Sequence, residues 1–584
     1  MSDSNVIPAP SGDGTTADRL AEMTPRTLGW PLLALAILGS LYGFLAVTSL
    51  EDDSVTVDEF GHLPIGWKVL TTGDFRYCTL NPPLMNVLSA LPLLFMDMTP
   101  RPMPEHPDIE VGTNFWANGY DFMFQHAGQY HRLYVAARCV TVALVGLLGL
   151  LGYFWAGQLA PERRVTAGLL AAALIGFSPN ILAHARLVTT DAGAACFTAL
   201  AAFAFHALLS RPTAWRTLAC GLALGLAQLV KFNAVLLYPA FVIAAIQWRL
   251  TRPGTCSKRL AAGVLVTFVV SVLVINAGYL FHGALPGLGS LELTSPGGAW
   301  LREMLPASTP LPLPREFVLA LDRQLAETHG GDPRFFFGRS YESEEAGLWH
   351  YFVALLAIKT PLPLLVLAGL GVAAAVRRTR LGWGESGILL WPALILLVVL
   401  SCFSNKQLGL RMLLPAAPLV WIWASVMLAR ADWAYPLRWA PAILVIWLGI
   451  DVARIHPHYL AYFNPLVGGP SQGHRYALDA NLDWGQDLIH LKRWFDECGE
   501  QSIQLLYFGR VDPAVYGLNY TVPTQHVQAG YVAVSVSLLG RSYFLNDHGK
   551  IMRAGPLELD PGVFGQPVAV IGHTIRVHRI DAAR

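Results

Sequence analysis

Long apolar runs alternate with short polar stretches over most of the chain. Runs such as 30–50 and 260–281 match the roughly 20 residues that a helix needs to cross the hydrocarbon core of a bilayer. The pattern predicts an α-helical polytopic membrane protein with about eleven transmembrane helices. The predicted spans are 30–50, 134–156, 165–183, 191–209, 217–230, 233–248, 260–281, 350–375, 386–402, 411–429 and 439–455.

Basic residues are unevenly distributed between the short loops. With a cytoplasmic N-terminal tail, 1–28, one set of loops carries most of the Lys and Arg, as the positive-inside rule requires. The segments 51–133, 282–349 and 456–584 then lie on the outer side. The basic residues of the predicted cytoplasmic loops are Arg163, Arg164, Arg211, Arg216, Arg249, Arg252, Lys258, Arg259, Arg377, Arg378, Arg380, Arg430 and Arg438.

Two features are expected at the membrane surface. Segment 84–98 is apolar but too short to span, and a crossing there would invert every later loop, so it predicts a helix in the outer interface. Tryptophans near the predicted span ends are typical of an aromatic belt. They are Trp155, Trp215, Trp248, Trp349, Trp383 and Trp439.

The chain divides by composition into the tail 1–28, a membrane domain 29–455 with outer loops 51–133 and 282–349, and a soluble part 456–584. The tail lacks the basic region of a signal peptide, so the first span is expected to be retained. In segment 456–584, polar residues separate short runs of residues that favour β-strands. This pattern predicts a small periplasmic α/β domain. Its expected strands are 502–508, 531–539 and 567–579, and its expected helix is 485–497.

The composition of the chain excludes several classes of protein. Of 584 residues, 54% are hydrophobic and 14% are charged, against about 25% charged residues in an ordinary soluble domain. The 41 basic and 40 acidic residues nearly cancel, which excludes a nucleic-acid binder. Seven cysteines are too few and too scattered for a disulfide scaffold, and whether Cys78 and Cys498 pair stays open.

Two adjacent carboxylates, Asp58 and Glu59, follow the first span. There they could bind a cation or accept a proton from a hydroxyl nucleophile, or they could form only the charged start of a helix. His62 shares a helical face with them, as an orienting group or as an ordinary hydrogen-bonded histidine.

Further along, Asp191 lies at the outer entrance of a span, where it could cap the helix or face the first outer loop. Lys231 lies where the chain must turn back between two apolar segments. Isolated cations at membrane depth are costly unless they meet an anion, and a lipid-linked phosphate is a suitable one. For Arg186, snorkelling to lipid headgroups is the alternative. The outer cations are Arg132, Arg138, Arg186, Lys231, Arg334, Arg339, Lys359, Lys406 and Arg411.

Several short motifs along the chain, in their order, resemble those of polyprenyl-phosphate-dependent glycosyltransferases of the membrane class GT-C. These enzymes are related to protein O-mannosyltransferases and aminoarabinose transferases. The last of the motifs resemble a bacterial branch with its own C-terminal domain. The motifs are Asp58-Glu59 with His62, Gly73-Asp74, Asn81-Pro82-Pro83-Leu84, Arg186 to Asp191, Leu229-Val230-Lys231-Phe232, Ile358 to Pro363, Arg411 to Pro415, Leu460 to Asn464, Gly468-Gly469-Pro470 and Asn481 to Leu488.

The resemblance implies a GT-C fold with an active site on the outer face of the cell inner membrane. It implies a sugar donor on undecaprenyl phosphate or a similar lipid, a glycan, lipid or protein acceptor, and inversion at the anomeric carbon. Asp58 would be the general base and Glu59 its partner, and Lys231 and Arg411 would hold the leaving phosphate. His62, Asn81, Asp191 and Arg186 would support the substrate site. Relatives differ in metal use and the loop lacks Asp-x-Asp, so no metal ligand is assigned and a divalent metal cofactor stays open.

Two other classes of function stay open. A flippase or transporter for lipid-linked sugars would need polar residues buried in mid-span and usually repeat symmetry, and the predicted spans are nearly free of acids. A membrane assembly scaffold could instead use the segment 456–584.

Overall fold

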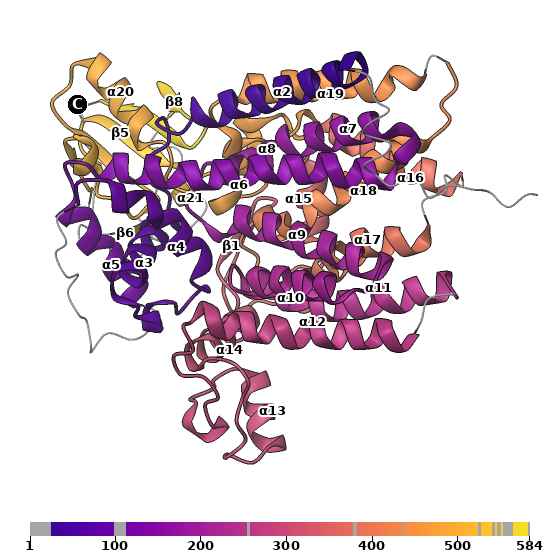
Figure 1. The fold of residues 1–584 in the computed structure, drawn as a ribbon. Coiled ribbons are helices and arrows are strands. Elements are labelled where there is room, and N and C mark those ends of the chain that lie inside the picture. The colour runs from indigo at the N-terminus through magenta and orange to yellow at the C-terminus, as the bar shows by residue number, and fades with distance from the viewer. Residues whose placement is uncertain are drawn as a thin grey trace, which may run out of the picture.

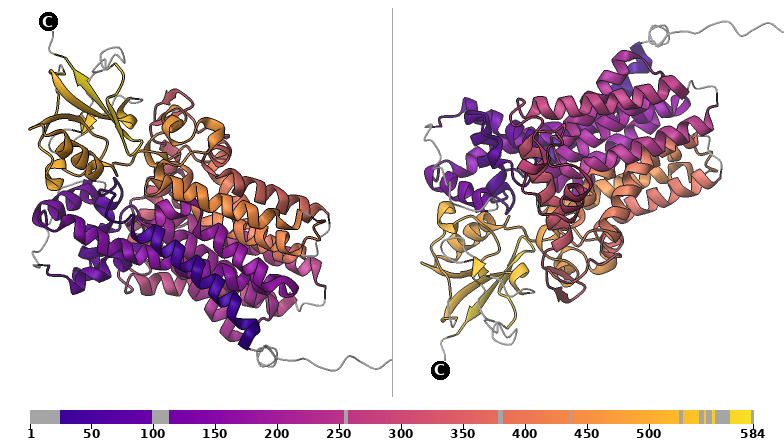
Figure 2. Two further views of the ribbon diagram at one scale, coloured as in Figure 1. Left: turned by 90° about the horizontal axis from the view of Figure 1, so that it is seen from above. Right: turned by 90° about the horizontal axis from the view of Figure 1, so that it is seen from below.

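The computed structural model consists mainly of one long bundle of helices, with the C-terminal sheet and the outer helices at one end (Figures 1 and 2). It describes residues 25–98, 113–253, 257–377, 382–435, 437–523, 527–539, 544–545, 551–552 and 565–581. Most of the predicted cytoplasmic tail, 1–24, and Arg378 and Arg380 lie outside these residues.

Seven helical segments among the described residues are long and apolar enough to cross a membrane. Two bent helix pairs raise the number to nine if each pair is one span. The seven are Gly29–Val47 in α2 (Pro25–Val47), α6 (Tyr130–Leu159), α9 (Thr190–Ser210), η4 with α11 (Phe232–Leu236 and Leu237–Thr251), Lys258–Gly278 in α12 (Ser257–Gly278), α17 (Trp383–Cys402), and η6 with α18 (Leu410–Ala416 and Ala417–Arg430).

The predicted count of eleven is not confirmed. The predicted span 217–230 forms α10 (Ala214–Gln228) and 439–455 forms α19 (Ala440–Ile455), which have only 15 and 16 residues. Both pack along the bundle, α10 against α12 and α19 against α16. Helices of this length fall short of the roughly 20 residues of a full crossing.

The predicted spans 165–183 and 350–375 are not straight helices. η3 (Pro161–Arg163) with α7 (Arg164–Gly176) meets α8 (Pro179–Ala185) at 62°, and α15 (Tyr351–Lys359) meets α16 (Leu362–Val376) at 113°. Both breaks coincide with prolines, Pro179 and Pro361, which lack the backbone N–H that a continuing helix needs.

The ends of α6, α9 and α11 that point away from the sheet pack together. The ring of His206 lies between Trp155 and Trp248, with centroids 6.1 and 5.9 Å apart. Both tryptophans are 1% exposed, so the aromatic-belt prediction is wrong for them. It fits Trp215, Trp349, Trp383 and Trp439, which are exposed.

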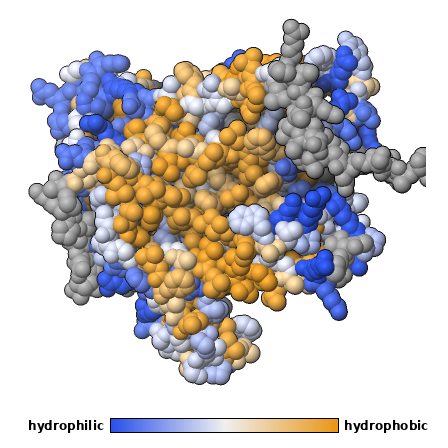
Figure 3. Space-filling model, in the orientation of Figure 1, coloured by the Kyte–Doolittle hydropathy of each residue, from blue (hydrophilic) through white to orange (hydrophobic). Residues whose placement is uncertain are grey.

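The surface has the polarity of a membrane protein. Figure 3 shows an apolar surface over most of the bundle, with polar residues at both ends. Exposed Leu147, Ile246 and Val269 contribute to it from three different helices. The chain is thus a multi-pass membrane protein.

The first outer loop folds into short helices beside the start of α6. Segment 84–98 forms α4 and a 3-10 turn that together are too short to span, and Phe95 at its end is 91% exposed. Gly66 brings α3 and α4 together, because a Cβ there would lie 1.9 Å from the carbonyl oxygen of Asn86. The elements are α3 (Glu59–Thr72), η1 (Phe75–Tyr77), α4 (Leu84–Ala90), η2 (Leu91–Phe95) and α5 (Thr113–Gln125).

The second outer segment, 282–349, lies beside the ends of α10 and α12 (Figure 1). It contains η5 (Leu288–Ser290), α13 (Pro296–Met304), α14 (Arg315–Gly330) and a small hairpin of β1 (Arg334–Phe336) and β2 (Arg339–Tyr341). Leu229, Tyr279 and Phe317 belong to one apolar cluster, which joins α14 to the membrane helices.

The C-terminal region forms a five-stranded sheet with the order β4-β3-β5-β9-β8. β3 pairs in parallel with β4 and β5, and β9 pairs antiparallel with β5 and β8. The predicted strand 567–579 is a hairpin instead, because positive φ angles at Gly572 and His573 reverse the chain. The strands are β3 (Ile503–Leu506), β4 (Tyr520–Thr521), β5 (Gly530–Ser535), β8 (Ala569–Ile571) and β9 (Ile575–Ile580).

The predicted helix 485–497 corresponds to α20 (Leu488–Cys498), which begins after Asp487. Cys498 at its end is exposed and Cys78 is buried, and both are free thiols. The other elements among the described residues are η7 (Leu437–Trp439), η8 (Tyr459–Ala461), η9 (Pro465–Val467), η10 (Pro470–Arg475), η11 (Asp479–Asn481), η12 (Pro513–Tyr516), α21 (Val536–Leu539), β6 (Phe544–Leu545) and β7 (Ile551–Met552).

Candidate active site

A cavity of about 540 Å³ opens where the first and second outer segments meet the membrane helices. α3, η4, α14, α17 and η6 all contribute to its wall. One part of the wall is apolar, with Val235, Leu236 and Leu400 among its residues. The polar and charged lining residues are Asp58, His62, Asn81, Thr190, Lys231, Asn233, Arg323, Gln324, Glu327, Thr328, Asp332, Ser404, Lys406 and Arg411.

Asp58 is the residue before α3 and presents its carboxylate to the cavity. The side chain makes no capping hydrogen bond and is 24% exposed. Nη1 of Arg411 donates to its Oδ2 at 2.7 Å. Asp58 is therefore held by one cation but stays accessible to a molecule in the cavity.

Asp191 holds the two predicted phosphate-binding cations together. Nζ of Lys231 lies 2.5 Å from Oδ1 of Asp191, and Nη1 of Arg411 lies 3.5 Å from Oδ2. Asp191 is fully buried in the first turn of α9, and the capping position belongs to Thr189. Asp191 is therefore not itself the N-cap residue but an acid of the first turn, and it acts as the common counter-ion.

Lys231 lies in the turn that the sequence predicts. α10 ends at Gln228 and η4 begins at Phe232, with extended backbone at Lys231 between them. Its side chain is 19% exposed, so the ammonium group is accessible from the cavity.

Arg411 also contacts the C-terminal region. Its guanidinium lies 4.4 Å from the ring of buried Trp484, and its Nε donates to the carbonyl of Leu408 at 3.1 Å. Stacking on an aromatic face fixes the plane of a guanidinium group. The segment around Trp484 therefore orients Arg411 toward Asp58 and Asp191.

Glu59 does not line the cavity. Its carboxylate is fully buried and paired with Arg138, at 2.8 and 2.7 Å. It also accepts hydrogen bonds from Thr56 and from the backbone N–H of Val188. Burial alone would raise the pKa of Glu59, but Arg138 and these donors lower it overall. This geometry favours a positioning role for Glu59 over the predicted role as partner in proton transfer.

His62 and Asn81 both line the cavity. His62 is 3% exposed, and its Nδ1 lies 2.9 Å from Oδ1 of Asn86 in α4. Burial lowers the pKa of His62, although Asp58, Asn86 and Asp191 partly offset the effect. A neutral ring that donates from Nδ1 leaves Nε2 as a hydrogen-bond acceptor.

Arg186 does not reach the cavity. It is 2% exposed, and its Nη2 donates to Oδ2 of Asp53 at 2.6 Å. Its guanidinium also lies 4.9 Å from the ring of Tyr459. The snorkelling interpretation is therefore wrong, and Arg186 ties the first outer loop to the segment after α19.

Lys359, another outer cation, is held by backbone carbonyl groups. Its Nζ donates to the carbonyls of Leu460, Tyr462 and Asn481, and it lies 4.4 Å from the ring of Phe463. Six of the predicted outer cations thus find partners within the protein, namely Arg138, Arg186, Lys231, Lys359, Lys406 and Arg411.

A second charged group in the cavity escaped sequence reasoning. Nζ of Lys406 lies 2.6 Å from Glu327, which also accepts from Arg323 at 3.2 Å. Asp332 lies nearby, and burial raises its pKa. Glu327 and Asp332 belong to the long segment 282–349, where they resemble ordinary surface acids; only Lys406 stood out as an outer cation.

Residues 93–283 match the family model described as dolichyl-phosphate-mannose-protein mannosyltransferase. The matched part includes Arg186, Asp191 and Lys231, while Asp58 and Arg411 lie outside it. No curated protein matches the chain.

Solved structures of two membrane proteins resemble the chain at low sequence identity. ArnT from Cupriavidus metallidurans in the apo state is 17% identical, with 76% of this chain and 65% of that chain covered and a TM-score of 0.44. ArnT bound to undecaprenyl phosphate is 15% identical, with 94% and 98% covered and a TM-score of 0.44. The Archaeoglobus fulgidus oligosaccharyltransferase in the apo form is 12% identical, with 92% and 75% covered and a TM-score of 0.49.

The family match confirms the resemblance predicted from the motifs. The chain is a multi-pass membrane protein, and its residues 93–283 are similar to the protein mannosyltransferase family.

Proposed function

We propose that this protein is an inverting glycosyltransferase that moves a sugar from a polyprenyl-phosphate donor to a hydroxyl acceptor. One observation supports the proposal most directly. Asp58, Lys231 and Arg411 come from distant parts of the chain, yet all three line one cavity. A glycosyl phosphate already carries a good leaving group. Transfer therefore needs mainly a base for the acceptor hydroxyl and, at the same place, cations that bind the leaving phosphate.

Asp58 is the proposed general base. Its carboxylate is accessible in the cavity, as a group must be that accepts a proton from an acceptor hydroxyl. The acceptor oxygen would attack the anomeric carbon from the face opposite the lipid phosphate, which inverts the configuration. The C1–O bond to the phosphate breaks, and the phosphate leaves with the bonding electron pair.

Arg411 and Lys231 are the proposed phosphate clamp. During the reaction Asp58 gains a proton while negative charge grows on the leaving phosphate. Arg411 pairs with Asp58 at 2.7 Å. When Asp58 takes up the proton it loses its negative charge, so the Arg411 guanidinium would become available to the phosphate as the negative charge on the phosphate grows. Asp191 keeps both cations in place throughout, because it is buried and pairs with each of them.

The proposed location is the cell inner membrane, with a cytoplasmic N-terminus and the C-terminal domain, 456–584, in the periplasm. The C-terminal sheet and the helices α3 and α5 lie toward the same end of the bundle (Figure 1), and α3 contributes to the cavity wall. Arg252 and Glu385 pair at the opposite end, in the loops predicted to be cytoplasmic. The proposed donor is a sugar on undecaprenyl phosphate or a similar lipid, and the acceptor is a glycan, lipid or protein.

The test compares Asp58→Asn with Asp52→Asn. Asp52 lies in the same loop but pairs with exposed Arg493 outside the cavity. In a deletion strain, mass spectrometry of glycolipids and glycoproteins identifies the sugar that is lost and the molecule that carried it. Wild type and Asp52→Asn are expected to restore it, whereas Asp58→Asn lowers the transfer rate at least about 100-fold.

Binding of undecaprenyl phosphate to purified Asp58→Asn, measured by native mass spectrometry, should persist because the two clamp cations remain. Full transfer by Asp58→Asn would contradict its role as the base. Movement of lipid-linked sugar across vesicles without any glycosidic product would favour a flippase instead.

A further inference from the structure

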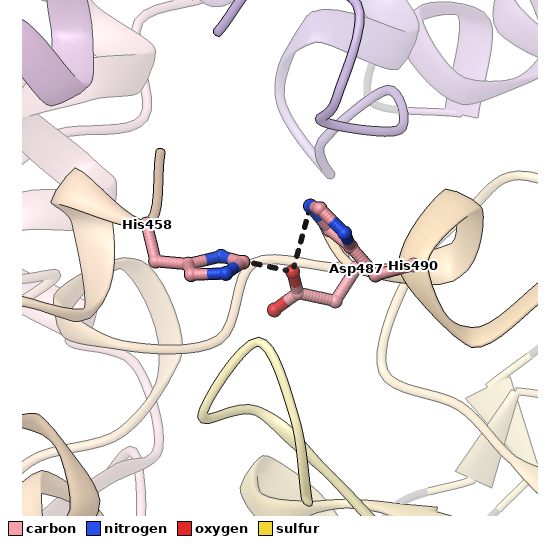
Figure 4. Close-up of side chains that lie close together, drawn as sticks. All are labelled: His458, Asp487 and His490. Atoms are coloured by element: carbon pink, nitrogen blue, oxygen red, sulfur yellow. Dashed lines mark ion pairs between the residues drawn. The ribbon is translucent and has the colours of Figure 1, made fainter. Parts of the chain in front are cut away.

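A cluster of two histidines and an aspartate lies outside the cavity, where the C-terminal region meets the end of α19. His458 lies between α19 and η8, Asp487 immediately precedes α20, and His490 lies in the first turn of α20. Asp487 and His490 share a helical face because they are three residues apart. Figure 4 shows the Asp487 carboxylate between the two imidazole rings.

The three facing atoms are too far apart for good hydrogen bonds and close enough to share an ion. Oδ1 of Asp487 lies 3.6 Å from Nδ1 of His458 and 4.0 Å from Nε2 of His490. All three atoms lie within 4.8 Å of one another. An N–H···O hydrogen bond is about 2.9 Å long, whereas ligands about 2.1 Å from a tetrahedral zinc ion lie about 3.4 Å apart.

None of these three atoms has a hydrogen-bond partner among the described residues, although all three are buried. Buried polar atoms in native proteins nearly always have one. The Asp487 side chain is fully buried, and its other oxygen, Oδ2, accepts from the hydroxyl of Thr574 at 2.6 Å. Thr574 thus orients the carboxylate, as residues behind a metal ligand commonly do, and Oδ1 is left facing the histidines.

The turn between β8 and β9 packs directly against this carboxylate. Gly572 has a φ of 57°, and a Cβ at this position would lie 2.0 Å from Oδ1 of Asp487. A side chain there would therefore occupy the space next to the cluster. The two histidine side chains are partly accessible, 22% for His458 and 17% for His490, at atoms other than the buried facing nitrogens.

We propose that His458, Asp487 and His490 bind a divalent transition-metal ion of the zinc class, which fastens the C-terminal region to the end of α19. Two imidazole nitrogens and one carboxylate oxygen suit zinc, whereas magnesium and calcium prefer sites made of oxygens alone. Because the ligands come from both sides of this junction, the bound ion contributes to its stability. The site is independent of the proposed transfer reaction.

The first test measures metal content. Full-length protein is purified in detergent through a tag without histidines, and zinc is measured by plasma mass spectrometry. Wild type is expected to hold about one zinc per chain, and His490→Gln and Asp487→Asn to lose it. His474→Gln is the matched control, because His474 lies in the same region but pairs with Arg576; it is expected to keep the zinc.

The second test uses protein stripped with a chelator. Zinc is expected to raise the melting temperature of wild type and His474→Gln but not that of His490→Gln. Cobalt added to stripped wild type should give the visible absorption bands of a low-symmetry site, a readout that needs no variant. The proposal is overturned if wild type holds no more zinc than His490→Gln. It is also overturned if stripped wild type shows neither response, in which case the cluster is only an ion pair.

Discussion

Two neighbouring carboxylates in this chain have opposite surroundings. Asp58 is 24% exposed in the cavity and has one partner, Arg411, while Glu59 is fully buried and surrounded by donors. The α3 helix begins between them, so one side chain faces the cavity and the other faces the protein interior. We therefore expect substitutions of Asp58 to affect chemistry and substitutions of Glu59 to affect stability.

Glu59→Gln removes the charge partner of Arg138 in a fully buried ion pair. Breaking such a pair leaves an uncompensated buried charge, so the free energy of unfolding is expected to fall by about 3–5 kcal/mol. The melting temperature of the purified protein measures this loss. Asp496→Asn is the control, because its pair with Lys492 is exposed and contributes about 0.5 kcal/mol or less. An unchanged melting temperature with lost activity would instead support a catalytic role for Glu59.

The buried His62 should make the stability of the folded protein depend on pH. Burial lowers its pKa in the folded protein below the value of about 6.5 in the unfolded chain. The unfolded chain then binds more protons, so this contribution is complete above about pH 6.5 and is lost as the pH falls toward the lower folded pKa. Melting temperatures between pH 8 and 5 should fall less steeply for His62→Gln than for wild type. Equal slopes would mean that His62 titrates alike in both states.

At the scale of elements, the cavity depends on the close contact between α3 and α4. His62 and Asn86 connect the two helices beside Gly66, whose missing side chain permits the approach. Gly66, which has no side chain, thus determines where Asp58 and His62 lie.

Gly66→Ala is expected to lower transfer activity even though alanine favours helices by about 1 kcal/mol over glycine. The added Cβ would lie 1.9 Å from the Asn86 carbonyl, so α3 and α4 must separate. Gly43→Ala in α2 is the matched control, because nothing lies within 4 Å of its Cβ position. The comparison uses activity per folded protein, and equal activity of the two variants would contradict this account.

The hydrophobic pattern predicted most of the helices and strands, but not every break within them. The turn at Lys231 was predicted because basic residues flank both outer ends of 217–248, and it is confirmed by the break between α10 and η4. The 113° bend between α15 and α16 was missed although Pro361 signals it, because hydrophobicity alone continues through the break. The hairpin at Gly572 was missed for the same reason.

At the scale of the whole molecule, the contacts that build the site join residues far apart in sequence. Arg411 meets Asp58, and Arg138 meets Glu59, and no local pattern specifies such pairs. The residue pattern therefore predicted which residue types gather on the outer side, and only the family resemblance distinguished Asp58 from Glu59. The cluster of His458, Asp487 and His490 was missed likewise, because its first ligand lies far from the other two.

Native Cys498 offers a direct test of orientation. It is exposed at the end of α20, in the region proposed to lie outside the membrane. Cys139 and Cys402 are also exposed, so both are first replaced by serine. In this background, a membrane-impermeant maleimide should label Cys498 in intact cells whose outer envelope is permeable, and Cys498→Ser should abolish this labelling. In that background, Arg211→Cys, in a loop predicted to be cytoplasmic, should react only after lysis. The opposite pattern would invert the proposed topology.

The apolar part of the cavity wall has a consequence for how turnover is measured. Val235, Leu236 and Leu400 adjoin the charged group of Asp58, Lys231 and Arg411. A donor with a charged head and a hydrocarbon tail would then enter and leave sideways, within the plane of the bilayer. Its encounter rate would follow two-dimensional diffusion, so the relevant concentration is the mole fraction of donor among the lipids. Diluting vesicles in buffer would leave the rate per enzyme unchanged, whereas diluting the donor with inert lipid would lower it.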